Sequence, residues 1–247
     1  MSLPAITYRR KPLSKSVVVR ACLVAVFCGW LMAVAGPPIR ADSAQVDLAL
    51  VVALDCSGSV DEEEFALQMN GLALAFRRPE TMEAIAQGDL QRIAVSVVHW
   101  SGSKSQVTVL PWTVIATAED ARNFADSVAA TLRGVDPGAT AISSMLLFAE
   151  ILLDQAPRAN RKVIDVAADG PGNIGPPLDA VRGKLLGRGI TINGLAIENE
   201  WRKLGIYMQN KVAGGADHFV VTARDYEEFA DAIFRKLLKE ITGPGVS

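Results

Sequence analysis

The sequence predicts a single α/β domain with a mostly parallel central sheet and helices on both faces. From about residue 46 to residue 241, short apolar runs alternate with longer segments of helical periodicity. The run at 46–54 is apolar along nearly its whole length, which is typical of a strand covered on both faces. One pair of expected strands is joined by a tight turn at 101–104, so one antiparallel edge strand is expected.

The expected elements follow one another in a regular order. Strands are expected at 46–54, 92–100, 106–110, 162–168, 190–197 and 218–222. Helices are expected at 61–78, 119–132, 140–153, from after 177 to about 186, at 201–212 and at 224–241. The segment bracketed by Pro79 and Gly88 is expected to be a connection.

Residues 1–41 differ in composition from the rest of the chain. They contain six basic residues and no acidic residue, and they include an apolar stretch of 16 residues at 21–36. This stretch is short for a membrane span and suits the core of a signal peptide, and small residues follow it near Ala41. We expect 1–41 to be a signal peptide, with an uncleaved membrane anchor as the alternative, and 42–247 to be the domain. The expected location is therefore the periplasm or the cell exterior.

The remainder of the chain is acidic and contains one cysteine. After Ala41 there are 19 basic and 27 acidic side chains, a net charge of −8, which argues against nucleic acid as a partner. Cys22 and Cys28 fall in the expected leader, so Cys56 has no cysteine within the domain to pair with. We expect its side chain to point away from its polar neighbours and into the core.

Three oxygen-bearing side chains directly follow the first expected strand. They are Asp55, Ser57 and Ser59. In an open α/β sheet, ligands bind at the carboxyl ends of the strands, where these residues are expected to lie. One carboxylate with two hydroxyls is a set of hard oxygen ligands, which suits Mg²⁺ or Mn²⁺ better than zinc.

Two later residues add to this set. Thr140 is expected to open a helix after Gly138, and Asp169 directly follows the expected strand at 162–168. Together, the Asp-x-Ser-x-Ser element, Thr140 and Asp169 resemble the metal-ion-dependent adhesion site of the von Willebrand factor A domain family. The resemblance continues in element order from about residue 46 to residue 241. More narrowly, the chain resembles a bacterial exported branch of this family that has no assigned function.

The resemblance implies a Rossmann-like fold and a role for each site residue. Ser57 and Ser59 would coordinate the cation directly, whereas Asp55 and Asp169 would act largely through waters. Thr140 would approach the cation when a ligand binds. The open position would then take an Asp or Glu side chain of a protein partner. The implied function is an exported, divalent-cation-dependent adhesion or scaffold protein with Mg²⁺ or Mn²⁺ bound and no catalytic activity.

Two alternatives keep the acid at the end of the first strand. One is a membrane-anchored scaffold in which the metal is purely structural. The other is a phosphatase-like enzyme with Asp55 as the nucleophile. Position 57 is a serine in this chain, so the second acid that such an enzyme needs for proton transfer is missing.

Two further enzyme classes are less well supported. The segment 170–175 matches Gly-x-Gly-x-x-Gly between a strand and a helix, with Glu198 after the next strand, as in dinucleotide-binding proteins. However, Pro171 and the pair at 176–177 remove N–H groups that would cradle a phosphate, so a loop that shapes the rim of the metal site is preferred. A serine hydrolase is disfavoured because the chain lacks a Gly-x-Ser-x-Gly element, and His99 is expected in a strand.

Overall fold

The computed structural model describes residues 45–243, and the expected signal peptide or anchor lies outside this range. The described chain forms a six-stranded sheet in the order β3-β2-β1-β4-β5-β6. The strands are β1 (Val46–Asp55), β2 (Ile93–Trp100), β3 (Gln106–Ile115), β4 (Ala159–Ala168), β5 (Thr191–Ile197) and β6 (Val220–Ala223). All neighbouring strands are parallel except β2 and β3. The predicted α/β fold with one antiparallel edge strand is confirmed.

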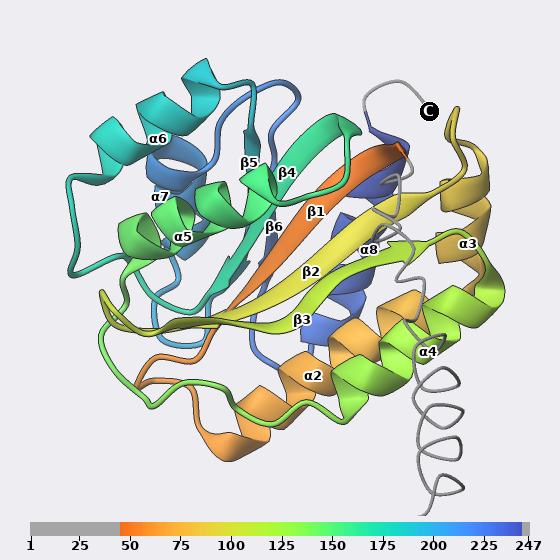
Figure 1. Ribbon diagram of the computed structural model, residues 1–247. Helices are drawn as coiled ribbons and strands as arrows, with labels where there is room; N and C mark the ends of the chain where they lie inside the picture. Colours follow the sequence, from red (N-terminus) through yellow and green to blue (C-terminus); the bar gives the residue numbers. More distant parts are fainter. Residues whose placement is uncertain (1–44, 244–247) are drawn as a thin grey trace, which may run out of the picture. The chain divides into compact units, whose positions relative to one another are not determined.

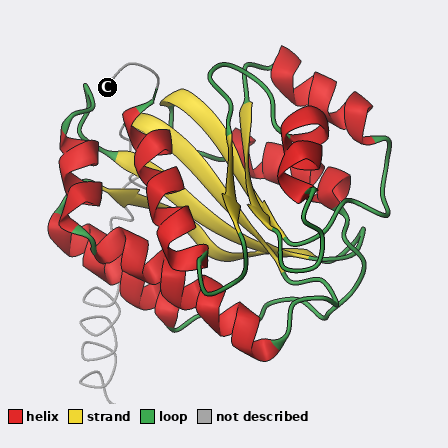
Figure 2. Cartoon of the chain, turned by 180° about the vertical axis from the view of Figure 1, so that it is seen from behind, coloured by secondary structure: helices red, strands yellow, loops and turns green. Residues whose placement is uncertain are grey.

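Helices cover both faces of this sheet (Figures 1 and 2). They are α2 (Glu62–Arg77), α3 (Pro79–Ala86), α4 (Ala118–Ala129), α5 (Ile142–Asp154), α6 (Leu178–Gly187), α7 (Leu204–Tyr207), the π-helix η1 (Met208–Val212) and α8 (Phe229–Thr242). No helix within residues 45–243 combines the length and the hydropathy that a membrane span requires.

The central strand β1 connects the two halves of the core. Its even-numbered residues from 48 to 54 pack with α2, α3, α4 and α8, and its odd-numbered residues from 49 to 53 pack with α5, α6 and α7. This division follows from the alternation of side chains along a strand. Both faces of β1 are covered by apolar side chains, which explains why its sequence is almost continuously apolar.

Four predicted elements were wrong in extent or type. The connection after Pro79 is the helix α3, because proline is well accommodated at a first helical position. Strand β3 continues through Pro111 to Ile115, which an edge strand with bulges in its pairing tolerates. The expected helix at 201–212 is the short α7 followed by η1. The last helix begins at Phe229 rather than at 224, because the residues before it form a turn.

A cluster of charged side chains is buried between α8 and the sheet. The Lys236 Nζ atom lies 2.5 Å from Asp165 Oδ1 and 2.5 Å from Glu240 Oε1. The Asn193 Nδ2 atom donates a hydrogen bond to the same Glu240 oxygen at 3.1 Å. One cation therefore faces two carboxylates away from water. Burial, and second the charge of Asp165, raise the pKa of Glu240 to about 7.

This raised pKa predicts that the domain becomes less stable between mildly acidic and neutral pH. The ordinary pKa of a glutamate is 4.5, so between 4.5 and about 7 the folded protein binds more protons at Glu240 than the unfolded protein does. The free energy of unfolding therefore falls as the pH rises through this window. Glu240→Gln should make this decline shallower, as measured by urea unfolding from pH 5 to pH 8. The exposed Glu227→Gln is the control, and equal slopes for all three proteins would contradict the prediction.

Candidate metal centre

The predicted site lies at the point where the connections of the sheet diverge. Strand β1 leads to α2 on one face, and its neighbour β4 leads to α6 on the other face (Figure 1). Asp55 is the last residue of β1, and Asp169 directly follows β4. Because β1 and β4 are adjacent and parallel, their carboxyl ends deliver both acids to one place.

A chain of hydrogen bonds joins four of the five predicted residues. The Ser57 backbone N–H donates to Asp55 Oδ1 at 2.7 Å, and the hydroxyl oxygens of Ser57 and Ser59 lie 3.2 Å apart. The Ser59 hydroxyl donates to Asp169 Oδ1 at 2.9 Å. The Asp-x-Ser-x-Ser segment and the end of β4 therefore form one connected polar cluster, as the sequence predicted.

Thr140 belongs to a neighbouring loop that is bonded to this cluster through backbone atoms. The Gly58 N–H donates to the carbonyl of Gly138 at 2.8 Å. Asn173 then holds Thr140 on its other side, since its side-chain oxygen accepts from the Thr140 N–H at 3.0 Å and its N–H donates to the Thr140 carbonyl at 2.9 Å. Within residues 45–243, no hydrogen bond joins the Thr140 hydroxyl to the other four residues. Helix α5 begins at Ile142, so Thr140 precedes the helix rather than opening it.

The two carboxylates create a local excess of negative charge. Asp55 is 1% exposed, and its Oδ2 atom has no hydrogen-bond partner. Burial, and second the charge of Asp169, raise the pKa of Asp55 to about 8. A divalent cation would relieve both the repulsion and the missing contact of Oδ2, so the residues present fit a metal.

The donor set indicates the kind of metal that would fit. In residues 45–243 no group of three or more His, Cys, Asp and Glu side chains is placed to hold an ion. The candidate ligands that the hydrogen bonds bring together are two carboxylates and two neutral hydroxyls, a set that suits a cation that prefers oxygen.

Arg133 fixes the backbone of the Asp-x-Ser-x-Ser segment and was not identified from the sequence. Its guanidinium donates to the carbonyls of Cys56 at 3.3 Å, Val60 at 2.9 Å and Asp61 at 2.8 Å. It also lies over the Phe65 ring, 5.0 Å from the centroid. An arginine in an expected loop carries no sequence signal for this role, because its partners are backbone atoms distant in the chain.

Two more buried side chains form hydrogen bonds with Asp55 and Asp169. The Tyr226 hydroxyl donates to Asp169 Oδ2 at 3.1 Å, and the Gln68 Nε2 atom donates to the Asp55 carbonyl at 3.1 Å. Tyr226 lies in the turn before α8, in a segment that was expected to be part of the last helix. Because Tyr226 was expected in a helix, its contact with Asp169 was not predicted.

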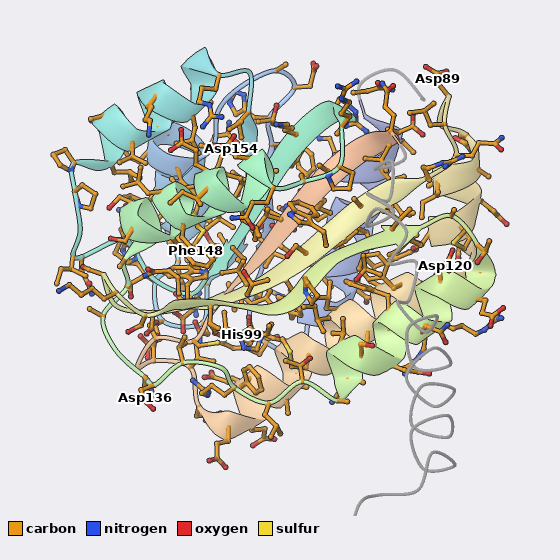
Figure 3. The ribbon with its side chains drawn as sticks, viewed as in Figure 1. Asp89, His99, Asp120, Asp136, Phe148 and Asp154 are labelled. Carbon is orange, nitrogen blue, oxygen red and sulfur yellow. The ribbon has the colours of Figure 1, made fainter. Side chains whose placement is uncertain are left out.

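Cys56 and His99 are poorly placed for catalysis. Cys56 is fully buried, as predicted, and burial raises the pKa of its thiol to about 12. His99 is also fully buried, and its Nδ1 atom accepts from the Gly134 N–H at 3.1 Å. Burial lowers the pKa of His99 to about 4. Figure 3 places His99 on β2 and Asp136 in the loop before α5, at the end of the sheet opposite Asp89.

The Gly-rich segment after β4 is packed against its neighbours. The Gly172 N–H donates to the Tyr207 hydroxyl at 3.2 Å, and the Asn173 N–H already bonds Thr140. Gly175 has a φ of 115°, and a Cβ atom there would lie 2.5 Å from the Ser143 hydroxyl. Because two backbone donors of the segment are engaged and Pro176 and Pro177 precede α6, the geometry favours a rim loop over a phosphate cradle.

The order and direction of the strands match the Rossmann-like α/β fold of von Willebrand factor A domains. A family model described as a protein of unknown function, DUF1194, matches residues 45–245. Because the match covers most of the chain, the protein belongs to this family. A comparison with curated protein sequences gives no match.

Several solved structures are similar in fold. One is the mussel byssus proximal thread matrix protein 1 with a zinc-occupied MIDAS motif (the metal-ion-dependent adhesion site), at 18% identity and a TM-score of 0.61 over 81% of this chain and 49% of that one. A von Willebrand factor type A protein from Catenulispora acidiphila is 18% identical, with a TM-score of 0.55 over 80% and 43% of the two chains. The pilus adhesin SpaC from Lactobacillus rhamnosus GG is 12% identical, with a TM-score of 0.57 over 80% and 31%. This chain spans less than half the length of each, and the likeness concerns the fold.

The cluster predicts one divalent-cation site in the domain. Isothermal titration of residues 42–247 with Mg²⁺ or Mn²⁺ should give a stoichiometry of one. Ser57→Ala combined with Ser59→Ala should abolish the binding while the circular dichroism spectrum is retained, because both hydroxyls are removed and the apolar core is not. The control is Ser103→Ala, which removes an exposed hydroxyl in the turn between β2 and β3. An unchanged affinity of the double variant for Mg²⁺ or Mn²⁺ would contradict the assignment of the site.

Proposed function

We propose that the domain is an exported, divalent-cation-dependent protein-binding module whose Mg²⁺ or Mn²⁺ site is completed by an Asp or Glu of a partner. The observation that carries this proposal is the convergence of Asp55, Ser57, Ser59 and Asp169 at one edge of the sheet. Thr140 lies in the adjoining loop, where Asn173 holds its backbone.

The chemistry of these residues supports a site that is open to a partner. Ser57 and Ser59 would hold the cation with neutral oxygens, and Asp55 and Asp169 would orient those hydroxyls. A cation with few anionic ligands in direct contact keeps a strong attraction for an incoming carboxylate. Mg²⁺ also retains several waters, so a partner oxygen can replace one of them.

The same residues argue against catalysis in this domain. The position two residues after Asp55 is a serine, which does not supply the acid that a phosphatase-like enzyme requires. Cys56 and His99 are fully buried, and the His99 Nδ1 atom is occupied by the Gly134 N–H. We therefore propose binding and not turnover.

The comparisons support this proposal at the level of the domain type. One neighbour in fold carries a zinc-occupied MIDAS motif, and another is a pilus adhesin. Export agrees with the composition of residues 1–41, which we propose to be a signal peptide or an uncleaved anchor. The domain has a negative net charge, and its proposed cation would attract a carboxylate. Both features favour a protein partner over nucleic acid.

Partner binding should depend on the metal. The immobilised domain is incubated with the envelope fraction of the producing cell in Mg²⁺ and, in parallel, in EDTA. The captured partner should be present with Mg²⁺ and absent with EDTA, and the Ser57→Ala, Ser59→Ala variant should behave like the EDTA sample. A partner that is retained equally in EDTA would indicate a scaffold in which any metal is structural.

Thr140→Ala should separate partner binding from metal binding. The variant removes one neutral oxygen, so the affinity for Mg²⁺ should fall only slightly. The affinity for the captured partner at saturating Mg²⁺ should fall by about 1–3 kcal/mol, because the Thr oxygen contributes to the partner-bound geometry. Both affinities are measured by titration calorimetry, with Ser103→Ala as the control. Equal partner affinity for Thr140→Ala and the unmodified domain would place the cation away from the interface.

A further inference from the structure

A cavity lies at the amino ends of the parallel strands, at the opposite end of the sheet from the proposed metal centre. It has a volume of about 470 Å³ and lies where β4 and β5 begin and α8 ends. In Figure 1 this is the edge at which β1 starts, far from the loops that carry Asp55 and Asp169. A volume of this size falls in the range of small-molecule sites, about 300–1,000 Å³.

The inner wall of the cavity is polar and incompletely bonded. Asn193 and Glu240 line the cavity and are 2% and 1% exposed. The Glu240 Oε1 atom is bonded by Lys236 and Asn193, but its Oε2 atom is buried without a hydrogen-bond partner. Asp165 shares the same lysine, so the buried cluster holds two acids for one cation. A buried acid without a full set of donors is unfavourable unless a further donor reaches it.

The mouth of the cavity has the opposite charge. Arg161 and Lys239 line it, and Asp217 is the acidic residue there. Lys162 also borders the cavity, but its Nζ atom donates to the Leu153 carbonyl at 3.3 Å. The Arg161 Nη2 atom donates to the Ile241 carbonyl at 2.7 Å, which fixes the half-buried guanidinium beside the end of α8. Lys239 lies over the Phe219 ring, 4.1 Å from the centroid. These positions place fixed cations within the lining and leave the other Arg161 N–H groups available to an anion.

We propose that this cavity binds a small zwitterion, an amino acid or related amino-carboxylate. Its ammonium group donates to Glu240 at the inner wall, and its carboxylate pairs with Arg161 and Lys239 at the mouth. The ligand thus supplies the donor that Glu240 Oε2 lacks. The site is independent of the proposed metal centre, because the two lie at opposite ends of the parallel strands.

A series of ω-amino acids of increasing length tests this charge arrangement. Glycine, β-alanine, 4-aminobutanoate and 6-aminohexanoate are titrated into the ¹⁵N-labelled domain in EDTA. At least one should shift the amide resonances of Thr191, Phe219 and Gly243 in a saturable way and leave that of Ser57 unchanged. Butanoate and butylamine each carry one of the two charges, and they should bind at least tenfold more weakly than the best amino acid.

Two substitutions locate the binding groups. Lys239→Gln should weaken binding by about tenfold, the effect of removing one charge-assisted contact. Arg235→Gln, an exposed position one turn earlier on α8, should leave binding unchanged. Glu240→Gln should abolish selectivity for the amino acid over butanoate. The proposal is overturned if no member of the series binds at 20 mM, if butanoate or butylamine binds as tightly, or if Lys239→Gln and Arg235→Gln behave alike.

Discussion

The whole candidate site depends on the burial of β1 between β2 and β4. Both neighbours are parallel to β1, and apolar side chains cover both of its faces, so the position of Asp55 is set by the core and not by a surface loop. The end of such a strand holds the Asp55 carboxylate close to Asp169, which directly follows the adjacent strand β4. The mutual repulsion of the two acids and the unpartnered Asp55 oxygen are consequences of this rigid placement. The proposed cation site would therefore be held in place by the core of the domain.

The fold and the convergence of four of the five predicted site residues followed from local patterns. A buried apolar strand that ends in Asp-x-Ser-x-Ser predicts where its oxygens lie, because the strand direction alone carries them to the sheet edge. The same reasoning placed Asp169 after β4. The relation of Thr140 to this edge depends on a loop between α4 and α5, whose course is set by the backbone bond from Gly58 to Gly138. No local pattern predicts a bond across that distance in the sequence.

The residues that the sequence did not identify share one property. The side chains of Arg133, Gln68 and Asn173 form hydrogen bonds with backbone atoms of distant segments. Every residue has similar backbone atoms, so the sequence does not indicate which segment such a side chain will contact. Tyr226 contacts a side chain, but only because the chain turns before α8 instead of continuing as helix. The buried Lys236 illustrates the same difficulty. On helical periodicity it is a charged residue on an amphipathic helix, and only the packing of α8 on β4 shows that Asp165 lies opposite it.

The proline in the edge strand β3 affects how copies of the domain meet one another. An uncovered strand edge is a template on which other strands can add through backbone hydrogen bonds. Pro111 carries no backbone N–H, and the pairing of β3 with β2 is interrupted by register shifts. The other edge, β6, has only four residues. Neither edge strand offers a long, regular row of free backbone groups. Copies of the domain at high local concentration should therefore not associate by pairing their edge strands.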